Sequence, residues 1–114
     1  MLSKSLIAAS TKPLLLCILN DGKSYGYAIT QRVKELSGGA MEWSDGMLYP
    51  VLKRMEKDGL IQSEWILSEE GRHRKYYAIT DAGKAELAIE REHWYSVHMT
   101  LAKFWGNKPE LSMG

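Results

Sequence analysis

The sequence predicts an α+β fold, and two segments in the middle of the chain support this prediction. Residues 46–61 have the apolar spacing of a short amphipathic helix that ends at Gly59 and leads directly into a strand. Residues 72–77 form a basic stretch, RHRKYY, that suits one arm of a hairpin. A helix of groove size beside a basic two-stranded projection is the layout of a winged helix-turn-helix. Double-stranded promoter DNA is therefore the first partner to consider.

Length and composition fit one small domain with an appended helix. The chain has 114 residues, of which 45% are hydrophobic, and no apolar run is long enough to span a membrane. Residues 14–19 are apolar, and we expect a core helix there rather than a secretion signal. The single cysteine, Cys17, lies in this run, so we expect a buried, inert thiol, a reducing cytoplasm and no thiolate zinc site. The histidines are not spaced as a metal site, and no cofactor is expected.

The net charge of +1 gives only weak support for nucleic-acid binding. The charges are nevertheless segregated along the chain. Basic residues gather in its middle, at Lys53, Arg54, Lys57, Arg72, Arg74 and Lys75, whereas Glu86, Glu90 and Glu92 lie nearer the end. Because phosphate contacts act over about 8–10 Å, local sign matters more than the total.

Two helices are predicted in the first third of the chain. The first runs from about Leu2 to Leu19, and Pro13 should kink it or break it into two pieces because proline lacks an N–H. The second should be capped by Ser24 and should reach about Leu36, before the glycines of residues 38–39.

The third helix contains two conflicting signals. Ser44 and Asp45 supply an N-cap and a first-turn acid, whereas Pro50 alone would place the start near Tyr49. We predict the earlier start, with local distortion at Pro50. Leu48, Val51, Leu52 and Met55 then form the buried stripe.

A hairpin and a fourth helix complete the predicted elements. Residues 61–67 alternate in polarity and residues 75–79 are rich in β-forming side chains, with a charged connection at residues 68–72. Thr80 should cap the final helix. We therefore divide the chain into a winged helix-turn-helix DNA-binding domain at residues 1–80, a C-terminal dimerisation helix at residues 81–106 and a flexible tail at residues 107–114.

The final helix has a heptad-like apolar pattern. Leu87, Trp94 and Leu101 are seven residues apart, Val97 and Phe104 occupy the alternate position, and Glu90 interrupts the series. So much apolar surface after a completed small core needs a partner, and a second copy of the chain is the simplest one. We expect a homodimer.

Several blocks resemble the PadR family of bacterial transcriptional regulators over about residues 13–84. They are Gly26-Tyr27, Leu48-Tyr49-Pro50, Glu56, Gly59-Leu60-Ile61, Gly71-Arg72, Arg74-Lys75-Tyr76-Tyr77, and Ile79-Thr80 with Gly83. The resemblance implies a winged-helix homodimer, joined through its first and last helices, that represses promoters and releases them when a ligand binds. The single C-terminal helix is similar to the short subfamily that includes the lactococcal multidrug-responsive repressor. Met47 departs from the family, which often carries a small hydroxyl residue there.

The exposed half of the third helix holds the first set of candidate DNA contacts. These candidates are Ser44, Met47, Tyr49, Lys53 and Arg54. The N-terminal part of a recognition helix approaches base edges in the major groove. Tyr49 could instead brace the helix as a half-buried side chain, and Lys53 and Arg54 could form an ordinary solvated face.

The second helix and the hairpin hold the remaining DNA candidates. Tyr25 or Tyr27 could reach phosphate, although Tyr27 could equally pack in the core, and Gly26 should allow the second helix to approach closely. His73, Arg74 and Lys75 place up to three positive charges on one strand, and alternation should let two of them reach DNA.

A ligand site is a further candidate at the expected dimer interface. Glu90, Trp94 and His98 are four residues apart on one helix face, and Leu6, Ala9 and Pro13 could form the neighbouring wall. The resemblance implies that Trp94 matches the tryptophan lining the drug pore of the lactococcal repressor. Glu90 at the rim would favour a small aromatic cation. The alternatives are simple dimer packing for Trp94 and a structural role for His98.

Two classes of function remain from the sequence. The first is a DNA-binding repressor with an effector-sensitive interface. The second is a winged-helix protein–protein adaptor that has lost DNA binding, which the near-neutral charge favours. An enzyme is not expected because no phosphate loop, nucleophile elbow or convergent acid–base set is present.

Overall fold

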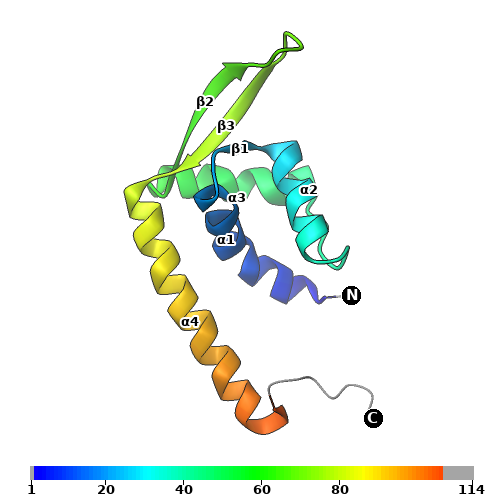
Figure 1. The fold of residues 1–114 in the computed structure, drawn as a ribbon, viewed down its shortest axis with the longest axis vertical. Helices are drawn as coiled ribbons and strands as arrows, with labels where there is room; N and C mark the ends of the chain where they lie inside the picture. Colours follow the sequence, from blue (N-terminus) through cyan, green and yellow to red (C-terminus); the bar gives the residue numbers. More distant parts are fainter. Residues whose placement is uncertain (1, 107–114) are drawn as a thin grey trace.

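The computed structural model describes residues 2–106, and it confirms a winged helix-turn-helix with an additional C-terminal helix (Figure 1). The elements in chain order are α1 (Lys4–Asn20), β1 (Ser24–Tyr25), α2 (Gly26–Leu36), α3 (Asp45–Lys57), β2 (Ile61–Leu67), β3 (His73–Ile79) and α4 (Asp81–Trp105). Helices α1, α2 and α3 cluster below the sheet, the β2–β3 hairpin projects from the cluster, and α4 leaves in the opposite direction. The expected tail at residues 107–114 lies outside the described residues.

Helix α1 is one continuous helix through Pro13, so the expected break into two pieces is wrong. Ser3 caps its start, where its side chain accepts a hydrogen bond from the Leu6 N–H. Beyond the proline, Leu15, Leu16 and Leu19 are almost completely buried. Their packing outweighs the loss of one hydrogen bond, which shows tertiary contacts overriding local propensity.

Ser24 does not cap α2, contrary to expectation. Instead, Ser24 and Tyr25 form the short strand β1, which pairs with Tyr77 and Tyr76 of β3. The helix begins at Gly26 after Tyr25, without a side-chain cap. A cap costs about 1 kcal/mol to lose, and two backbone pairings in the sheet compensate for it.

Helix α3 confirms the earlier start. The Ser44 hydroxyl accepts a hydrogen bond from the Met47 N–H, and Pro50 sits inside the helix. The helix ends before Gly59, whose φ of +78° lets the chain turn directly into β2. Strands β2 and β3 pair antiparallel from Ile61 with Ile79 to Leu67 with His73. The second arm thus begins two residues earlier than the predicted residues 75–79.

Helix α4 starts against the α3–β2 connection. As predicted, Thr80 caps it by accepting from the Gly83 N–H, and the Thr80 hydroxyl also donates to the Gly59 carbonyl at 2.6 Å. Gly83 is buried, and a Cβ there would overlap the Leu60 carbonyl oxygen. The first turn of α4 is therefore fixed to the winged-helix core, whereas its second half extends away from that core (Figure 1).

Candidate nucleic-acid interface

Helix α3 presents a basic exposed face opposite its buried stripe. Leu48, Leu52 and Met55 are buried as predicted, whereas Val51 is half-buried. The exposed side chains include the acid Asp45 in the first turn, and then Tyr49, Pro50, Lys53, Arg54 and Lys57. The other two helix candidates are differently placed. The Ser44 hydroxyl is engaged in the cap, and Met47 is half-buried against the core.

Tyr49 joins this face to α2 and to the sheet. Its hydroxyl lies over Gly26, in space that a Cβ on that residue would occupy, so Gly26 does allow the close approach that the sequence suggested. The ring braces the helices while 44% of the residue stays exposed. Burial raises the pKa of the neighbouring Tyr77, and Tyr49 and Glu56 raise it further.

The two α2 candidates differ in exposure. Tyr27 is 69% exposed in the first turn of α2, which excludes the alternative that it packs in the core. Tyr25 is half-buried, and its ring makes an edge contact with Tyr76 at 5.2 Å between centroids. The Arg74 guanidinium carbon lies 4.6 Å from the centre of the Tyr25 ring, so Tyr25 positions a hairpin cation.

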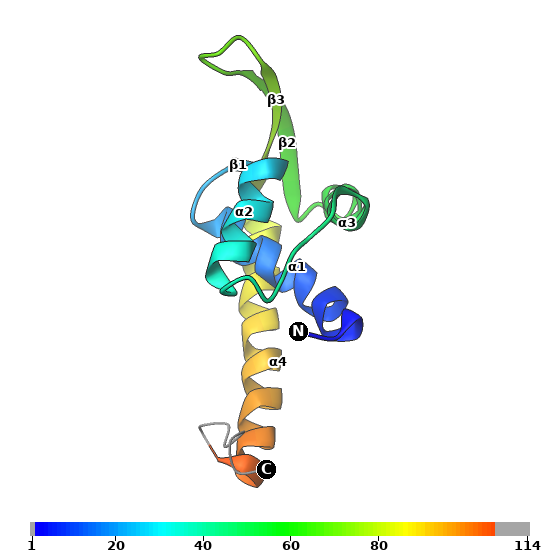
Figure 2. The ribbon, with the colours of Figure 1, turned by 90° about the vertical axis from the view of Figure 1, so that its right-hand side faces the viewer.

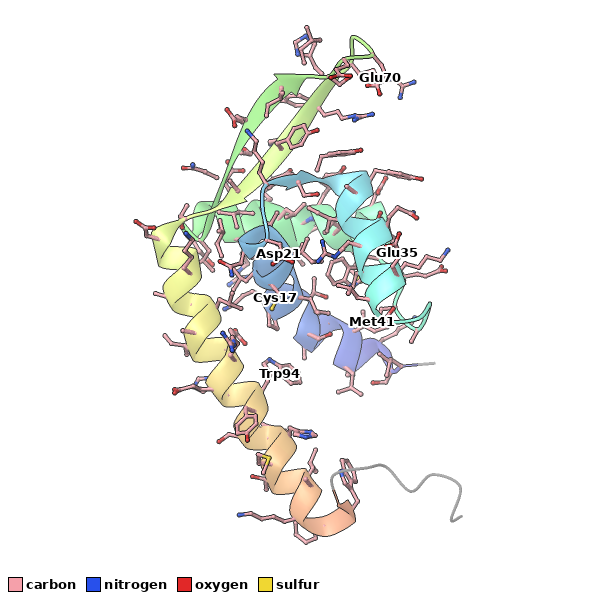
Figure 3. All side chains as sticks on the ribbon, viewed as in Figure 1. Cys17, Asp21, Glu35, Met41, Glu70 and Trp94 are labelled. Atoms are coloured by element: carbon pink, nitrogen blue, oxygen red, sulfur yellow. The ribbon has the colours of Figure 1, made fainter. Side chains whose placement is uncertain are left out.

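The hairpin divides its basic residues between two faces. Arg74 is held over Tyr25 on one face. Lys75 lies on the other, with its Nζ 5.7 Å from the Tyr77 ring, and His73 has the same parity as Lys75. At the tip, hydrogen bonding to its own backbone and to Ser68, together with the Arg74 charge, lowers the pKa of Glu70 (Figure 3).

Helix α3 and the hairpin meet at a corner. In Figure 2, α3 is seen end-on to one side of the hairpin base, and the hairpin extends beyond it. The Ser63 hydroxyl of β2 donates to the Glu56 carboxylate of α3 at 2.6 Å. This contact fixes the hairpin face that carries Ser63 toward α3, so His73 and Lys75 share the side on which α3 lies.

The sequence did not indicate the roles of three residues of this corner, Glu56, Ser63 and Trp65. The Glu56–Ser63 hydrogen bond was not foreseen, because nothing in local spacing aligns α3 with β2. Trp65 was read only as part of strand alternation, yet it is 66% exposed. The sequence pattern could have indicated this exposure, because the apolar face from Ile61 to Leu67 is longer than a single short helix can cover.

A cavity of about 400 Å³ lies between α1 and α4. Four residues of the predicted ligand set line it, namely Leu6, Pro13, Glu90 and Trp94, whereas Ala9 and His98 are not among its lining residues. Figure 3 shows Trp94 on the side of α4 that faces α1 and Met41.

Cys17 also lines this cavity and is exposed, so the expectation of a buried thiol is wrong. It lies on the side of α1 turned toward α4, where the two helices leave space between them. Partial desolvation raises the pKa of the thiol, which keeps it protonated at neutral pH.

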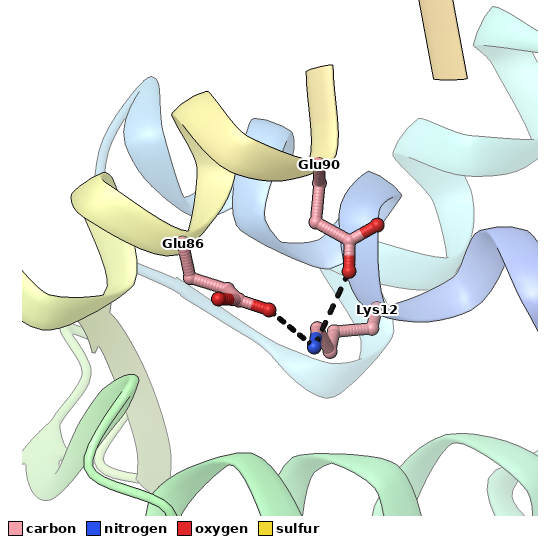
Figure 4. Close-up of polar contacts among 3 residues, drawn as sticks. All are labelled: Lys12, Glu86 and Glu90. Atoms are coloured by element: carbon pink, nitrogen blue, oxygen red, sulfur yellow. Dashed lines mark hydrogen bonds and ion pairs between the residues drawn. The ribbon is translucent and has the colours of Figure 1, made fainter. Parts of the chain in front are cut away.

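An ion-pair cluster connects α1 and α4 beside the cavity. The Lys12 ammonium lies 2.6 Å from Glu86 and 3.2 Å from Glu90 (Figure 4). The hydrogen bond to Glu86 raises the pKa of Lys12 against an opposing effect of burial. Because Lys12 neutralises Glu90, the charge argument for a cationic ligand does not hold.

Membrane-spanning helices and clusters of metal-ligating side chains are absent from residues 2–106. No helix there combines the length and apolar character needed to cross a bilayer. No three His, Cys, Asp or Glu side chains gather there as a metal site.

The fold and the basic corner together define the class of winged-helix regulators. Residues 15–89 match the model of the Transcriptional regulator PadR-like family. The chain belongs to this family. The resemblance drawn from the sequence blocks is thereby confirmed at the level of the family.

Two curated relatives are named transcriptional regulators. The chain is 42% identical over 71 residues to the transcriptional regulator Rv3488 of Mycobacterium tuberculosis. The aligned segment covers 62% of this chain and 63% of that protein. It is 33% identical over 76 residues to the negative transcriptional regulator PadR of Bacillus subtilis, which covers 67% of this chain and 42% of that protein. The chain thus spans less than two thirds of each of these regulators.

Solved structures agree in fold over most of the chain. A transcriptional regulator from Clostridium thermocellum superposes with a TM-score of 0.82 at 28% identity, covering 91% of this chain and 98% of that one. A PadR family transcription regulator from hypervirulent Clostridium difficile R20291 gives a TM-score of 0.75 at 33% identity, covering 85% and 99%.

Proposed function

We propose that this transcriptional regulator binds duplex DNA as a homodimer and represses transcription. The observation that carries the proposal is the basic corner formed by the exposed face of α3 and the hairpin, which carries Lys75 on its α3 side and Arg74 on its other face. Tyr49, Lys53 and Arg54 would face the major groove, and the hairpin cations would contact the backbone or the minor groove. Repression is the activity named for the Bacillus subtilis relative.

The exposed half of α4 supports the dimer. Val97 is 53% exposed, Leu101 40% and Phe104 88%, although all three are apolar. A twofold interface would cover this stripe with its own copy. Two recognition helices would then read half-sites spaced by about 34–36 Å, one turn of the duplex.

The cavity supports an effector site within that dimer. Its lining is apolar around Trp94, and Lys12 already neutralises the nearest acid. We propose a flat aromatic effector as in the short subfamily, and the paired Glu90 gives no preference for a cation. Binding between α1 and α4 would change the angle at which α4 leaves the winged-helix core, and hence the half-site spacing.

Mobility shifts with the chain's own upstream region, at two salt concentrations, test DNA binding. Replacing Lys75 or Arg74 with Ala should weaken binding across sequences and lower the salt slope by about 1 for each lost phosphate contact. Unchanged slopes for both variants would contradict the hairpin contacts. Absence of any shift for the unmodified protein would favour the adaptor.

A tryptophan-fluorescence titration with planar aromatic dyes tests the effector site, with Trp94→Ala as the comparison. We expect saturable quenching in the unmodified protein and its loss in the variant. Sedimentation of both proteins shows whether the variant is still dimeric. Equal quenching in two equally dimeric proteins would rule out this pocket.

A further inference from the structure

Trp65 is a large aromatic side chain that the winged-helix core leaves uncovered. It lies in the middle of β2 and is 66% exposed, and Leu67, two residues further along the same strand face, is 59% exposed. Ile61, at the base of that face, is 2% exposed. The apolar pattern therefore continues from the core out along the hairpin, beyond the point where the chain can bury it.

The orientation of Trp65 follows from the strand register. Ser63 bonds to Glu56 of α3, so the face holding Ser63, Trp65 and Leu67 is the one turned toward α3. Trp65 is paired with Lys75, and Leu67 is paired with His73. Trp65 thus stands beside Lys75 and His73, which share the α3 side of the hairpin, at the corner proposed to receive DNA.

On the hairpin face that carries Trp65, strands β2 and β3 contain no carboxylate. Strands β2 and β3, both wholly within the described residues, contain one carboxylate, Glu64. Glu64 has the opposite parity, on the other face, and lies 3.6 Å from Lys23. The acid on the α3 side, Glu56, accepts the hydrogen bond of Ser63, and the ring itself is bordered by Lys75 and His73. An apolar ring beside a lysine complements a polyanion that also offers apolar surface.

We propose that Trp65 is a DNA-contacting residue whose indole packs against deoxyribose in the backbone of duplex DNA. This inference rests on the proposed function and adds a contact to the same corner. In a duplex the bases are stacked on one another, whereas the sugars expose C–H groups between successive phosphates. The flanking Lys75 and His73 would contact those phosphates, so the indole would supply apolar affinity without reading sequence.

Such a contact has a signature that separates it from an ionic one. Removing an apolar group releases no additional counterion, so affinity should fall while the salt slope stays constant. Trp65→Ala should weaken binding about fivefold to tenfold, and by the same factor for the upstream duplex and for a mixed-sequence duplex. Trp65→Phe should retain most of the affinity, and Lys75→Ala should lower the slope.

Fluorescence gives a second readout that does not depend on affinity. The unmodified protein should change its indole emission when either duplex is added. Trp65→Phe should lose most of this change, whereas Trp105→Phe, the control on the distant end of α4, should keep it. Because Trp65 lies outside the core, both Trp65 variants should keep the thermal midpoint of the unmodified protein.

The possible outcomes distinguish the two proposals. If the unmodified protein binds neither duplex, the proposed DNA-binding function fails, and this inference fails with it. If it binds but Trp65→Ala binds equally well, only the present inference is overturned, and the exposed ring becomes a candidate protein contact. A reduced salt slope in Trp65→Ala would also overturn it, since the contact would then not be apolar.

Discussion

Apolar side chains are buried in the winged-helix core but exposed along the second half of α4. In the core, Leu15, Leu48 and Leu52 are each 0% exposed. Along residues 93–105 of α4 every residue is exposed except Ala102, which is 8% exposed. Both regions are helical and both carry a regular apolar pattern, so the pattern alone does not distinguish them.

The difference lies in what each apolar pattern packs against. Core leucines contact side chains from other elements of the same chain, which makes the winged helix self-sufficient. A helix in a protein gains most of its stability from packing its apolar face against other elements. Within residues 2–106 the second half of α4 has no such packing, and its exposed apolar stripe is what supports the proposed dimer.

A matched pair of substitutions tests this distinction with the largest expected effect. Leu52→Ala should lower the free energy of unfolding by about 2–5 kcal/mol, because it removes a buried side chain and leaves a cavity. Leu101→Ala should change it by less than about 0.5 kcal/mol at concentrations where the protein is monomeric. Urea unfolding measures both values.

Sedimentation at higher concentration completes the test. Leu101→Ala should weaken self-association, and Leu52→Ala, when folded, should not. Equal losses of monomer stability in the two variants would mean that the stripe of α4 is covered within one chain, and the comparison would break.

Features set by neighbouring residues could be predicted from the sequence. Ser44 and Thr80 cap their helices as expected, because a cap involves a side chain and a backbone group only three residues away. The strand from Ile61 to Leu67 was likewise predicted from its alternating polar and apolar residues. In the candidate site, the division of hairpin cations between two faces followed from the same alternation.

Features set by distant residues could not be predicted. Ser24 forms a strand because β3, fifty residues away in the chain, offers backbone partners. Cys17 is exposed because α4 does not close over that side of α1. The ion pair between Lys12 and Glu86 joins residues 74 positions apart in the chain, and no local spacing indicates it.

A second pair of substitutions sharpens the comparison at the junction of the two regions. Gly83→Ala should destabilise the protein by about 1–3 kcal/mol, because the new methyl group would meet the backbone oxygen of Leu60 and a side-chain carbon of Ile79. Gly46→Ala is the control in the first turn of α3, where a Cβ would meet only the Ser44 hydroxyl oxygen at 4.0 Å, an ordinary contact distance. It should be neutral or stabilising by up to about 1 kcal/mol through helix propensity. Thermal unfolding of both proteins would contradict this account if Gly83→Ala were the more stable.

The smallest expected effect concerns the ion-pair cluster of Lys12, Glu86 and Glu90 that connects α1 and α4. Lys12→Met should cost about 0.5–1 kcal/mol near pH 7, since solvent screens a side chain that is 39% exposed. The pKa of Lys12 is raised in the folded protein, so this contribution is complete below the ordinary value of 10.5 and is lost as pH rises through the folded value. The stability difference between the two proteins, measured by urea unfolding, should therefore be constant around neutrality and shrink above pH 10.5. In the Glu86→Gln background the same lysine substitution should cost less, because one of its two partners is already neutral. A difference that is independent of both pH and Glu86 would mean that Lys12 acts through the packing of its methylene groups. Helix α4 would then be held to the core by its first turn and by apolar packing that includes the buried Leu87.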